Sequence, residues 1–313
     1  MNVASFSQKE LAARLKETLD AHVWGTIGPE SKAAASELAN LLGREAALLC
    51  SSHAASVETV LRALEVSFGD EVILPALCSP LLKEAVEAVG AKCVFCDVDE
   101  FLTLDAKRLS FCYSDRTVAV FCEEIAGYVC DLPAIRAFTE EHDLPLIDVC
   151  AAPYCTRLAD KPTAQYADIA VSLLPVMGVG ALVTDAEFIG KLYAAHHCGN
   201  PYGQAGGLNT GVCLGGDMRV DEFRSTLVRE AIRTADERRR AKNSVRIRLS
   251  EALLQDGAQP FPVRAEADSA GDFVLCEAIG RESCRDRADV LPYRTYTEAA
   301  RIAFAGVRAY RVI

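Results

Sequence analysis

Strand-like and helix-like segments alternate through the first two thirds of the chain, and no other feature limits its fold so strongly. Short apolar runs alternate with longer segments whose apolar residues recur at helical spacing. The expected strands are 45–50, 70–74, 93–98, 117–122, 144–149, 169–174 and 181–184, and the expected helices are 54–64, 80–89 and 132–141. This order predicts an α/β fold with a mainly parallel, seven-stranded sheet covered on both faces. Ligands of such sheets bind beyond the carboxyl ends of the strands.

The pattern changes after residue 186. A stretch rich in glycine, 199–216, cannot continue as a helix or strand, because glycine and proline interrupt both. One long charged helix is expected over 221–254, and the remainder, 257–313, is short and mixed. We therefore predict a large α/β domain over 1–220. A long helix and a small, shortened C-terminal α+β domain would follow over 221–313.

Charge and hydropathy exclude several classes of partner. The 313 residues carry a formal net charge of -11, which repels nucleic acid, and no basic stripe offsets it. No apolar run is long enough to span a membrane, and the N-terminus lacks the pattern of a secretory signal. We expect a cytoplasmic protein, with no nucleic acid or membrane partner, that keeps its 13 cysteines reduced.

Two groups of metal-ligating side chains are better explained by structure than by metal binding. Cys93 and Cys96 have a redox or metal spacing, but residues three apart on a strand point to opposite faces, so we expect two core thiols. His196 and His197 are adjacent, project in different directions and have no ligand set at a zinc spacing nearby. A loop or helix-end role is expected for them. The sequence predicts no metal site.

A series of short motifs runs in a fixed order through residues 25–255. Among them are Cys-Ser-Ser-His-Ala-Ala at 50–55, Gly-Asp-Glu-Val-Ile-Leu-Pro at 69–75, and further segments at 90–99, 126–148, 167–170, 180–185 and 214–223. Their order and spacing together resemble the DegT/StrS-type nucleotide-sugar aminotransferases. The resemblance implies the fold-type I fold of transferases that depend on pyridoxal phosphate (PLP). It also implies a dimer whose active sites are shared between subunits.

The resemblance sets a requirement that this chain does not meet. The cofactor needs a lysine for the Schiff base, and the family has it in the turn that follows strand 169–174. Here Met177 or Gly178 occupies that position, depending on where a one-residue gap is placed. The sequence has no lysine between Lys161 and Lys191, and no histidine stands in the turn, as it does in some dehydratases of the family. The resemblance therefore implies that the internal aldimine cannot form.

The residues that would hold the cofactor phosphate are partly retained. Ser51, Ser52 and His53 precede an expected helix whose first amides form a ready anion site, although Ser52 could simply cap that helix. Ser172 and Tyr154 are further cofactor-binding candidates. If any cofactor binds, we expect PLP or pyridoxamine phosphate (PMP), held without a covalent bond.

The acidic partner of the pyridine nitrogen is altered. The gapless match places Val149 where the family has its aspartate, and a slip of one residue would restore Asp148. Such a slip reverses the face to which a strand side chain points. Glu123 and Glu124 place carboxylates at the expected cleft edge, where Glu124 could bind a cationic group or face solvent. Arg219, in the motif at 214–223, is a second substrate-binding candidate.

Three functions remain open. The favoured hypothesis is a degenerate binding or regulatory subunit, a homodimer or a heterodimer with a related active aminotransferase. It would keep the scaffold and could take a small sugar or amino ligand. The first alternative is an enzyme with altered chemistry that binds PLP, PMP or a sugar nucleotide non-covalently. The second is an ordinary transaminase whose lysine comes from elsewhere in the chain.

Overall fold

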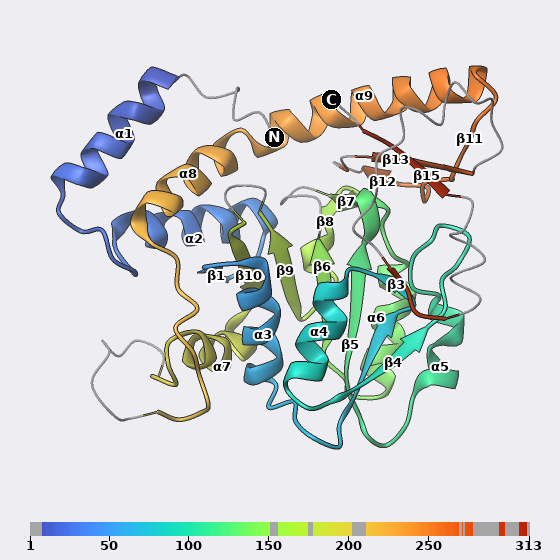
Figure 1. Ribbon diagram of the computed structural model, residues 1–313, viewed down its shortest axis with the longest axis horizontal. Coiled ribbons are helices and arrows are strands. Elements are labelled where there is room, and N and C mark those ends of the chain that lie inside the picture. The colour runs from blue at the N-terminus through green and yellow to red at the C-terminus, as the bar shows by residue number, and fades with distance from the viewer. Residues whose placement is uncertain are drawn as a thin grey trace.

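A seven-stranded sheet forms the centre of the molecule (Figure 1). The computed structural model describes residues 8–150, 156–174, 178–201, 211–268, 271, 273–277, 294–297 and 307–311. The strands lie in the order β1-β10-β9-β6-β5-β2-β4. Their bounds are Ala46–Cys50 (β1), Glu71–Pro75 (β2), Lys92–Cys96 (β4), Thr117–Glu124 (β5), Leu146–Cys150 (β6), Ile169–Leu173 (β9) and Gly180–Thr184 (β10). Only β10 is antiparallel to its neighbours, so the predicted mainly parallel sheet is confirmed.

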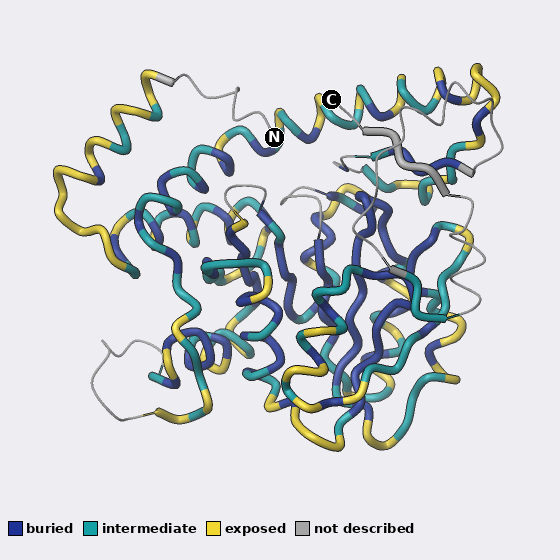
Figure 2. The backbone as a smooth tube through the Cα atoms, in the orientation of Figure 1, coloured by how far each residue is buried: buried dark blue, intermediate teal, exposed yellow. Residues whose placement is uncertain are grey.

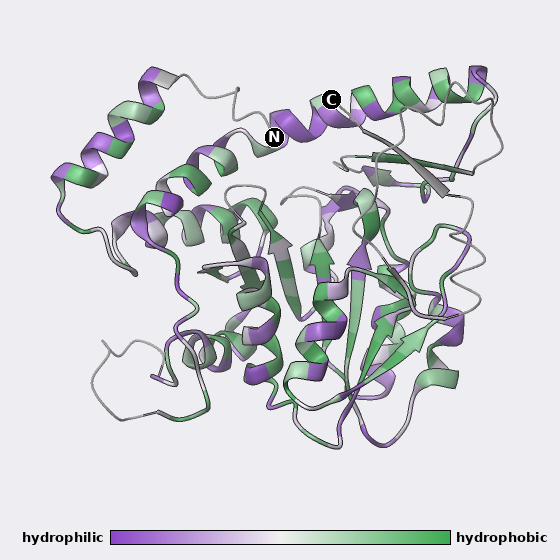
Figure 3. Cartoon of the chain, in the orientation of Figure 1, coloured by the Kyte–Doolittle hydropathy of each residue, from purple (hydrophilic) through white to green (hydrophobic). Residues whose placement is uncertain are grey.

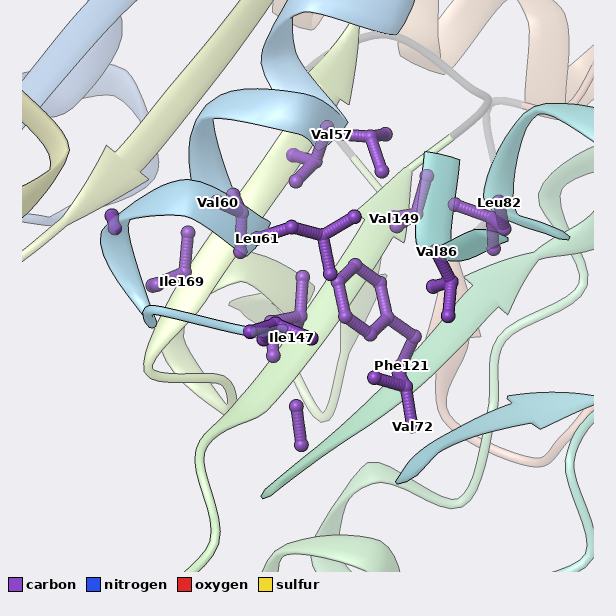
Figure 4. Close-up of a cluster of buried hydrophobic side chains, with 14 of the residues drawn as sticks. Val57, Val60, Leu61, Val72, Leu82, Val86, Phe121, Ile147, Val149 and Ile169 are labelled. Carbon is purple, nitrogen blue, oxygen red and sulfur yellow. The ribbon is translucent and has the colours of Figure 1, made fainter. Parts of the chain in front are cut away.

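Helices cover both faces of this sheet. One face is covered by α3 (His53–Ala63), α4 (Pro80–Ala88) and α7 (Ala186–His196), and the other by α2 (Pro29–Leu42), α5 (Leu109–Cys112), α6 (Leu132–Glu141) and α8 (Glu222–Arg233). Figure 2 shows the strands as the most deeply buried part of the chain. Figure 4 shows the first face, where Phe121, Ile147 and Val149 reach from the sheet toward Leu61 of α3 and Leu82 of α4.

Side chains at the helix starts explain where these helices begin. Ser52 precedes α3 and accepts a hydrogen bond from the backbone N–H of Ala55 at 3.0 Å. Asp131 and Asp221 accept equivalent bonds at the starts of α6 and α8. Each short polar side chain satisfies a donor that the helix cannot satisfy itself. Gly43, with φ of 64°, ends α2 in the left-handed conformation that glycine adopts most easily.

The single long helix predicted over 221–254 is wrong, because the structure divides it into α8 and α9 (Ala235–Gln255). Thr234 separates them with φ of -100° and ψ of 4°, and its hydroxyl donates back to the carbonyl oxygen of Glu230. The sequence contains no glycine or proline there. Tertiary packing bends the chain: α8 lies against α2 and α1 (Gln8–Asp20), whereas α9 continues toward the C-terminal strands. Figure 3 shows α9 as largely hydrophilic.

The C-terminal strands extend the fold beside the central sheet. A three-stranded sheet contains β11 (Gln259–Pro260), β13 (Phe273–Glu277) and β15 (Val307–Arg311). Another links β12 (Ala267–Asp268) to β7 (Arg157–Leu158) and β8 (Lys161–Pro162), and β14 (Arg294–Thr295) pairs with β3 (Leu77–Cys78). The short helices η1 (Ala106–Arg108), η2 (Ile125–Gly127) and η3 (Thr163–Gln165) complete the described elements. The domain boundary after residue 220 stays a prediction; α8, which follows it, packs on the large sheet domain.

The same elements test two further expectations from the sequence, one about Cys93 and Cys96 and one about membrane spans. On β4, Cys93 packs with the apolar cluster beneath α3 and α4, while Cys96 packs with the cluster on the opposite face. The expectation that these two thiols do not meet is therefore confirmed. Among the residues that the structure describes, no helix is both long and apolar enough to cross a membrane.

Candidate functional site

The turn before α3 is held in place from two sides. The backbone N–H of Ser51 donates to the carbonyl oxygen of Met218 at 2.7 Å, and the guanidinium of Arg224 donates to the carbonyl oxygen of Ser51 at 2.7 Å. Ser52 is the helix cap, as one of the two readings of the sequence proposed. The Nε2 atom of His53 lies 3.0 Å from the carbonyl oxygen of Leu174, so His53 ties the start of α3 to the end of β9.

Two backbone donors remain at the start of α3. Within the described part of the chain, the N–H groups of His53 and Ala54 meet no acceptor. Unpaired amides at the first turn of a helix, together with the helix dipole, favour an anion. The cap therefore leaves two donors free, and anion binding at this turn stays a prediction.

The last residues of β5 and β6 divide between the two faces of the sheet. Val149 packs in the cluster with Val57 of α3, and Figure 4 shows its side chain on that side. Glu123 faces the same way, because its Oε2 atom accepts the backbone N–H of Ser79 at 2.7 Å, just before α4. Burial raises the pKa of Glu123 to about 7. The sequence placed Glu123 with Glu124 at the expected cleft edge but gave it no binding role, and Glu123 is the next-to-last residue of β5.

Asp148 points to the other face and is not brought together with Ser52 and His53. Its carboxylate lies 3.5 Å from the thiol sulfur of Cys122 and 3.2 Å from that of Cys150. The side chain is fully buried, and burial raises the pKa of its carboxyl to about 6. The slip that would turn Asp148 toward α3 does not occur, since alternation along β6 places Val149 there instead.

Glu124 and Ser172 lie on the same face as Asp148. The expectation that the Glu123–Glu124 pair lies open at a cleft edge is wrong: Glu123 is 1% exposed and Glu124 is fully buried. Burial and the neighbouring Asp148 raise the pKa of the Glu124 carboxyl well above its usual range. Ser172 is 2% exposed, and its position on β9 is in register with Cys150 on β6. Both side chains are buried at the carboxyl edge, on the face away from α3.

The turn between β9 and β10 contains no lysine. Gly178 is exposed and has φ of 71°, whereas Met177 and Tyr154 lie outside the described residues. Every lysine of the sequence falls within the described ranges: Lys9, Lys16, Lys32, Lys83, Lys92, Lys107, Lys161, Lys191 and Lys242. Lys161 lies exposed on β8.

Arg219 pairs with Cys50 at the end of β1, next to the turn before α3. Its guanidinium forms two hydrogen bonds, of 2.6 and 2.8 Å, with the carboxylate of Asp217. It lines a groove of about 790 Å³ along the outer strand β1, together with His196 and His197. The two histidines stand at the end of α7, which confirms their expected helix-end position.

The match to a known family agrees with this architecture. The model of the DegT/DnrJ/EryC1/StrS aminotransferase family matches residues 6–296. The chain belongs to this family. It is 29% identical over 266 residues to the L-glutamine:2-deoxy-scyllo-inosose aminotransferase of Streptomyces paromomycinus, a match that covers 76% of this chain and 61% of that protein. It is also 29% identical over 212 residues to the UDP-N-acetyl-3-dehydro-alpha-D-glucosamine 3-aminotransferase of Acidithiobacillus ferrooxidans, covering 65% and 56%.

Solved structures of DegT-type proteins share the fold. A DegT DnrJ EryC1 StrS aminotransferase from Brucella abortus superposes with a TM-score of 0.87 at 18% identity, covering 97% of this chain and 90% of that one. The 3-amino-5-hydroxybenzoic acid synthase superposes with a TM-score of 0.80 at 23% identity, covering 87% and 74%. The chain spans about three fifths of the length of the curated relatives that it matches.

The described residues of this DegT-family chain fit only part of the PLP cofactor. The free amides of His53 and Ala54 suit a phosphate group. Val149 occupies the position on β6 that the family match gives to the aspartate of the pyridine nitrogen, and Glu123, in register with it on β5, accepts the backbone N–H of Ser79. No lysine stands in the turn between β9 and β10. The described residues thus offer donors for a phosphate, but neither the lysine nor the aspartate at the positions that the family match gives.

Proposed function

We propose that this chain is a non-transaminating member of the DegT family that acts in the cytoplasm as a binding or regulatory subunit. It would do so as a homodimer, or paired with a related active aminotransferase. The observation that carries the proposal is the lysine-free turn between β9 and β10. A transaminase needs the amine of that lysine to form a Schiff base, and neither a thioether nor a hydrogen atom can replace it.

The environment of Val149 supports the same conclusion. A carboxylate must hold the pyridine nitrogen protonated if the ring is to accept electrons. Val149 is instead fully buried among apolar side chains, including Val57 and Leu82. Asp148, the nearest acid in the sequence, is bound to two thiols on the other face. The chain thus lacks two of the three groups that the chemistry needs.

The free amides at the start of α3 favour one alternative, the non-covalent binding of a phosphorylated ligand. Members of the family depend on PLP, so PLP or PMP is the ligand to test first. The alternative of an ordinary transaminase would need a lysine from elsewhere. Lys161 is exposed on β8, outside the turn that carries the family's lysine.

Borohydride trapping tests the proposal. The purified chain is titrated with PLP, its visible spectrum is recorded, and borohydride is added before peptide mapping. We expect no adduct that maps stoichiometrically to one lysine, and no turnover of an amino donor. A single modified lysine with turnover would overturn the proposal. The double variants Met177→Lys, Val149→Asp and Gly178→Lys, Val149→Asp are the matched positive controls, because between them they restore both groups at the two lysine positions that the family match allows.

A further inference from the structure

Three metal-ligating side chains converge at the carboxyl ends of β5 and β6. A carboxylate oxygen of Glu124, one of Asp148 and the sulfur of Cys150 all lie within 4.8 Å of one another. Glu124 and Asp148 are fully buried, and Cys150 is 6% exposed. The three residues lie on the face of the sheet away from α3, so this cluster is separate from the turn that would bind a phosphate.

Asp148 and Cys150 contact each other, but several described polar atoms in and around the cluster lack partners. Among the described residues, neither carboxylate oxygen of Glu124 has a hydrogen bond donor. The hydroxyl of Ser172, 2% exposed, also has none, and Ser172 stands beside Cys150 in the register of β6 and β9. The hydroxyl of Thr156, 2% exposed, is a fourth such atom. The protein's own groups leave this many buried polar atoms unpaired in one place, which indicates that a bound ligand satisfies them.

Charge leads to the same conclusion. A buried carboxylate is costly unless a cation or a proton compensates it. Thiols, hydroxyls and a second carboxyl surround Asp148 and Glu124, and no described basic side chain forms an ion pair with either. A divalent cation bound between them would offset two of the three negative charges that the two acids and the thiolate carry.

The ligand types select the kind of cation. Magnesium and calcium prefer oxygen ligands alone, whereas a thiolate with carboxylates suits zinc and similar transition metals. Tetrahedral zinc, with Zn–S near 2.3 Å and Zn–O near 2.0 Å, would place sulfur and oxygen ligands about 3.5 Å apart. The sulfur of Cys150 lies 3.2 Å from an oxygen of Asp148. We propose that Glu124, Asp148 and Cys150 form a binding site for a divalent transition-metal ion of the zinc type.

Such an ion would join the ends of β5 and β6 beneath the edge of the sheet. The site goes beyond the proposed function, because it does not involve the turn before α3 or the turn between β9 and β10. Binding releases the thiol proton of Cys150, so the affinity should fall as the pH is lowered. The sequence could not reveal the site, since Glu124 lies more than twenty residues before Asp148 and no zinc spacing links them.

Cobalt(II) substitution tests the site directly. The full chain, free of any affinity tag, is stripped with a chelator and titrated with cobalt(II), and zinc then competes for the site. We expect one equivalent of cobalt to give a thiolate-to-cobalt charge-transfer band that zinc abolishes. Cys150→Ser should remove the band. Cys130→Ser is the matched control, because Cys130 is an equally buried thiol whose sulfur lies 3.7 Å from the carbonyl oxygen of Glu123, outside the ligand set.

Glu124→Gln provides a second measurement that does not depend on the folding of the cysteine variant. The glutamine side chain has nearly the same shape as glutamate but carries no charge. We therefore expect the dissociation constant for zinc to rise more than about tenfold. The absence of the band in the wild-type chain would overturn the proposal. So would a band that survives Cys150→Ser, or zinc binding that is equal in wild type and Glu124→Gln. PLP binding is measured separately, so failure of this site leaves the proposed function untouched.

Discussion

The adjacent histidines at the end of α7 should make the protein sensitive to acid. The Nε2 atom of His196 lies 2.9 Å from the carbonyl oxygen of Leu49 and therefore carries the proton, and its Nδ1 atom lies 2.9 Å from Nδ1 of His197. With both rings neutral, His197 donates to His196. Burial is the main cause that lowers the pKa of His196 to about 4 and that of His197 to about 3.

The size of the effect follows from these values. Below pH 6.5 the unfolded chain takes up protons at both histidines, whereas the folded chain does not until about pH 4. The free energy of unfolding is therefore highest above about pH 7, and it decreases as the pH falls from about 6.5 to about 4. At pH 5 the loss is about 2 kcal/mol for each histidine, or about 4 kcal/mol for the pair, from a typical total of about 5–15 kcal/mol.

His197→Phe is the variant that tests this reasoning. The ring of His197 stacks on Tyr193, with centroids 3.8 Å apart and planes at 11°, and phenylalanine can keep that contact. Urea unfolding at pH 8 and pH 5 gives the free energy of unfolding at each pH. We expect the variant to lose about 2 kcal/mol less than wild type between the two conditions. Tyr193→Phe, which keeps both imidazoles, is the control. An equal loss in wild type and His197→Phe would refute the explanation.

Three further substitutions test the packing and caps of the same fold by urea unfolding. Ser52→Ala removes the cap of α3 and should cost about 1 kcal/mol; a loss no larger than that of Ser51→Ala would contradict the capping role. Glu222→Ala should cost about 3 kcal/mol or more, because its buried carboxylate accepts the backbone N–H groups of Gly28, Glu30 and Ser31; Glu222→Gln, which keeps one acceptor, should cost less. Phe121→Ala, at the centre of the cluster in Figure 4, should cost about 3–5 kcal/mol, and a value below about 1 kcal/mol would show that the core refills the cavity.

The sequence by itself determined the central sheet, the helices α3, α4 and α6 that cover it, and the missing lysine. Hydrophobic periodicity and turn residues are local properties, so the seven strands of the central sheet and the start of α3 could be located without coordinates, whereas the two-residue strands β3, β7 and β8 could not. The alternation of side chains along a strand also separated Cys93 from Cys96 correctly. The absence of lysine between residues 161 and 191 is a fact of composition that no fold can change.

Tertiary structure alone decided which side chains meet. Whether Asp148 or Val149 faces α3 depends on the register of β6 between β5 and β9, and a slip of one residue would exchange them. The meeting of Glu124 with Cys150 depends on the pairing of two strands joined by a helix. The bend at Thr234 has no local signal, because the packing of α8 against α2 produces it. Contacts between distant segments are set by packing, and a periodic pattern read along one segment carries no information about its neighbours in space.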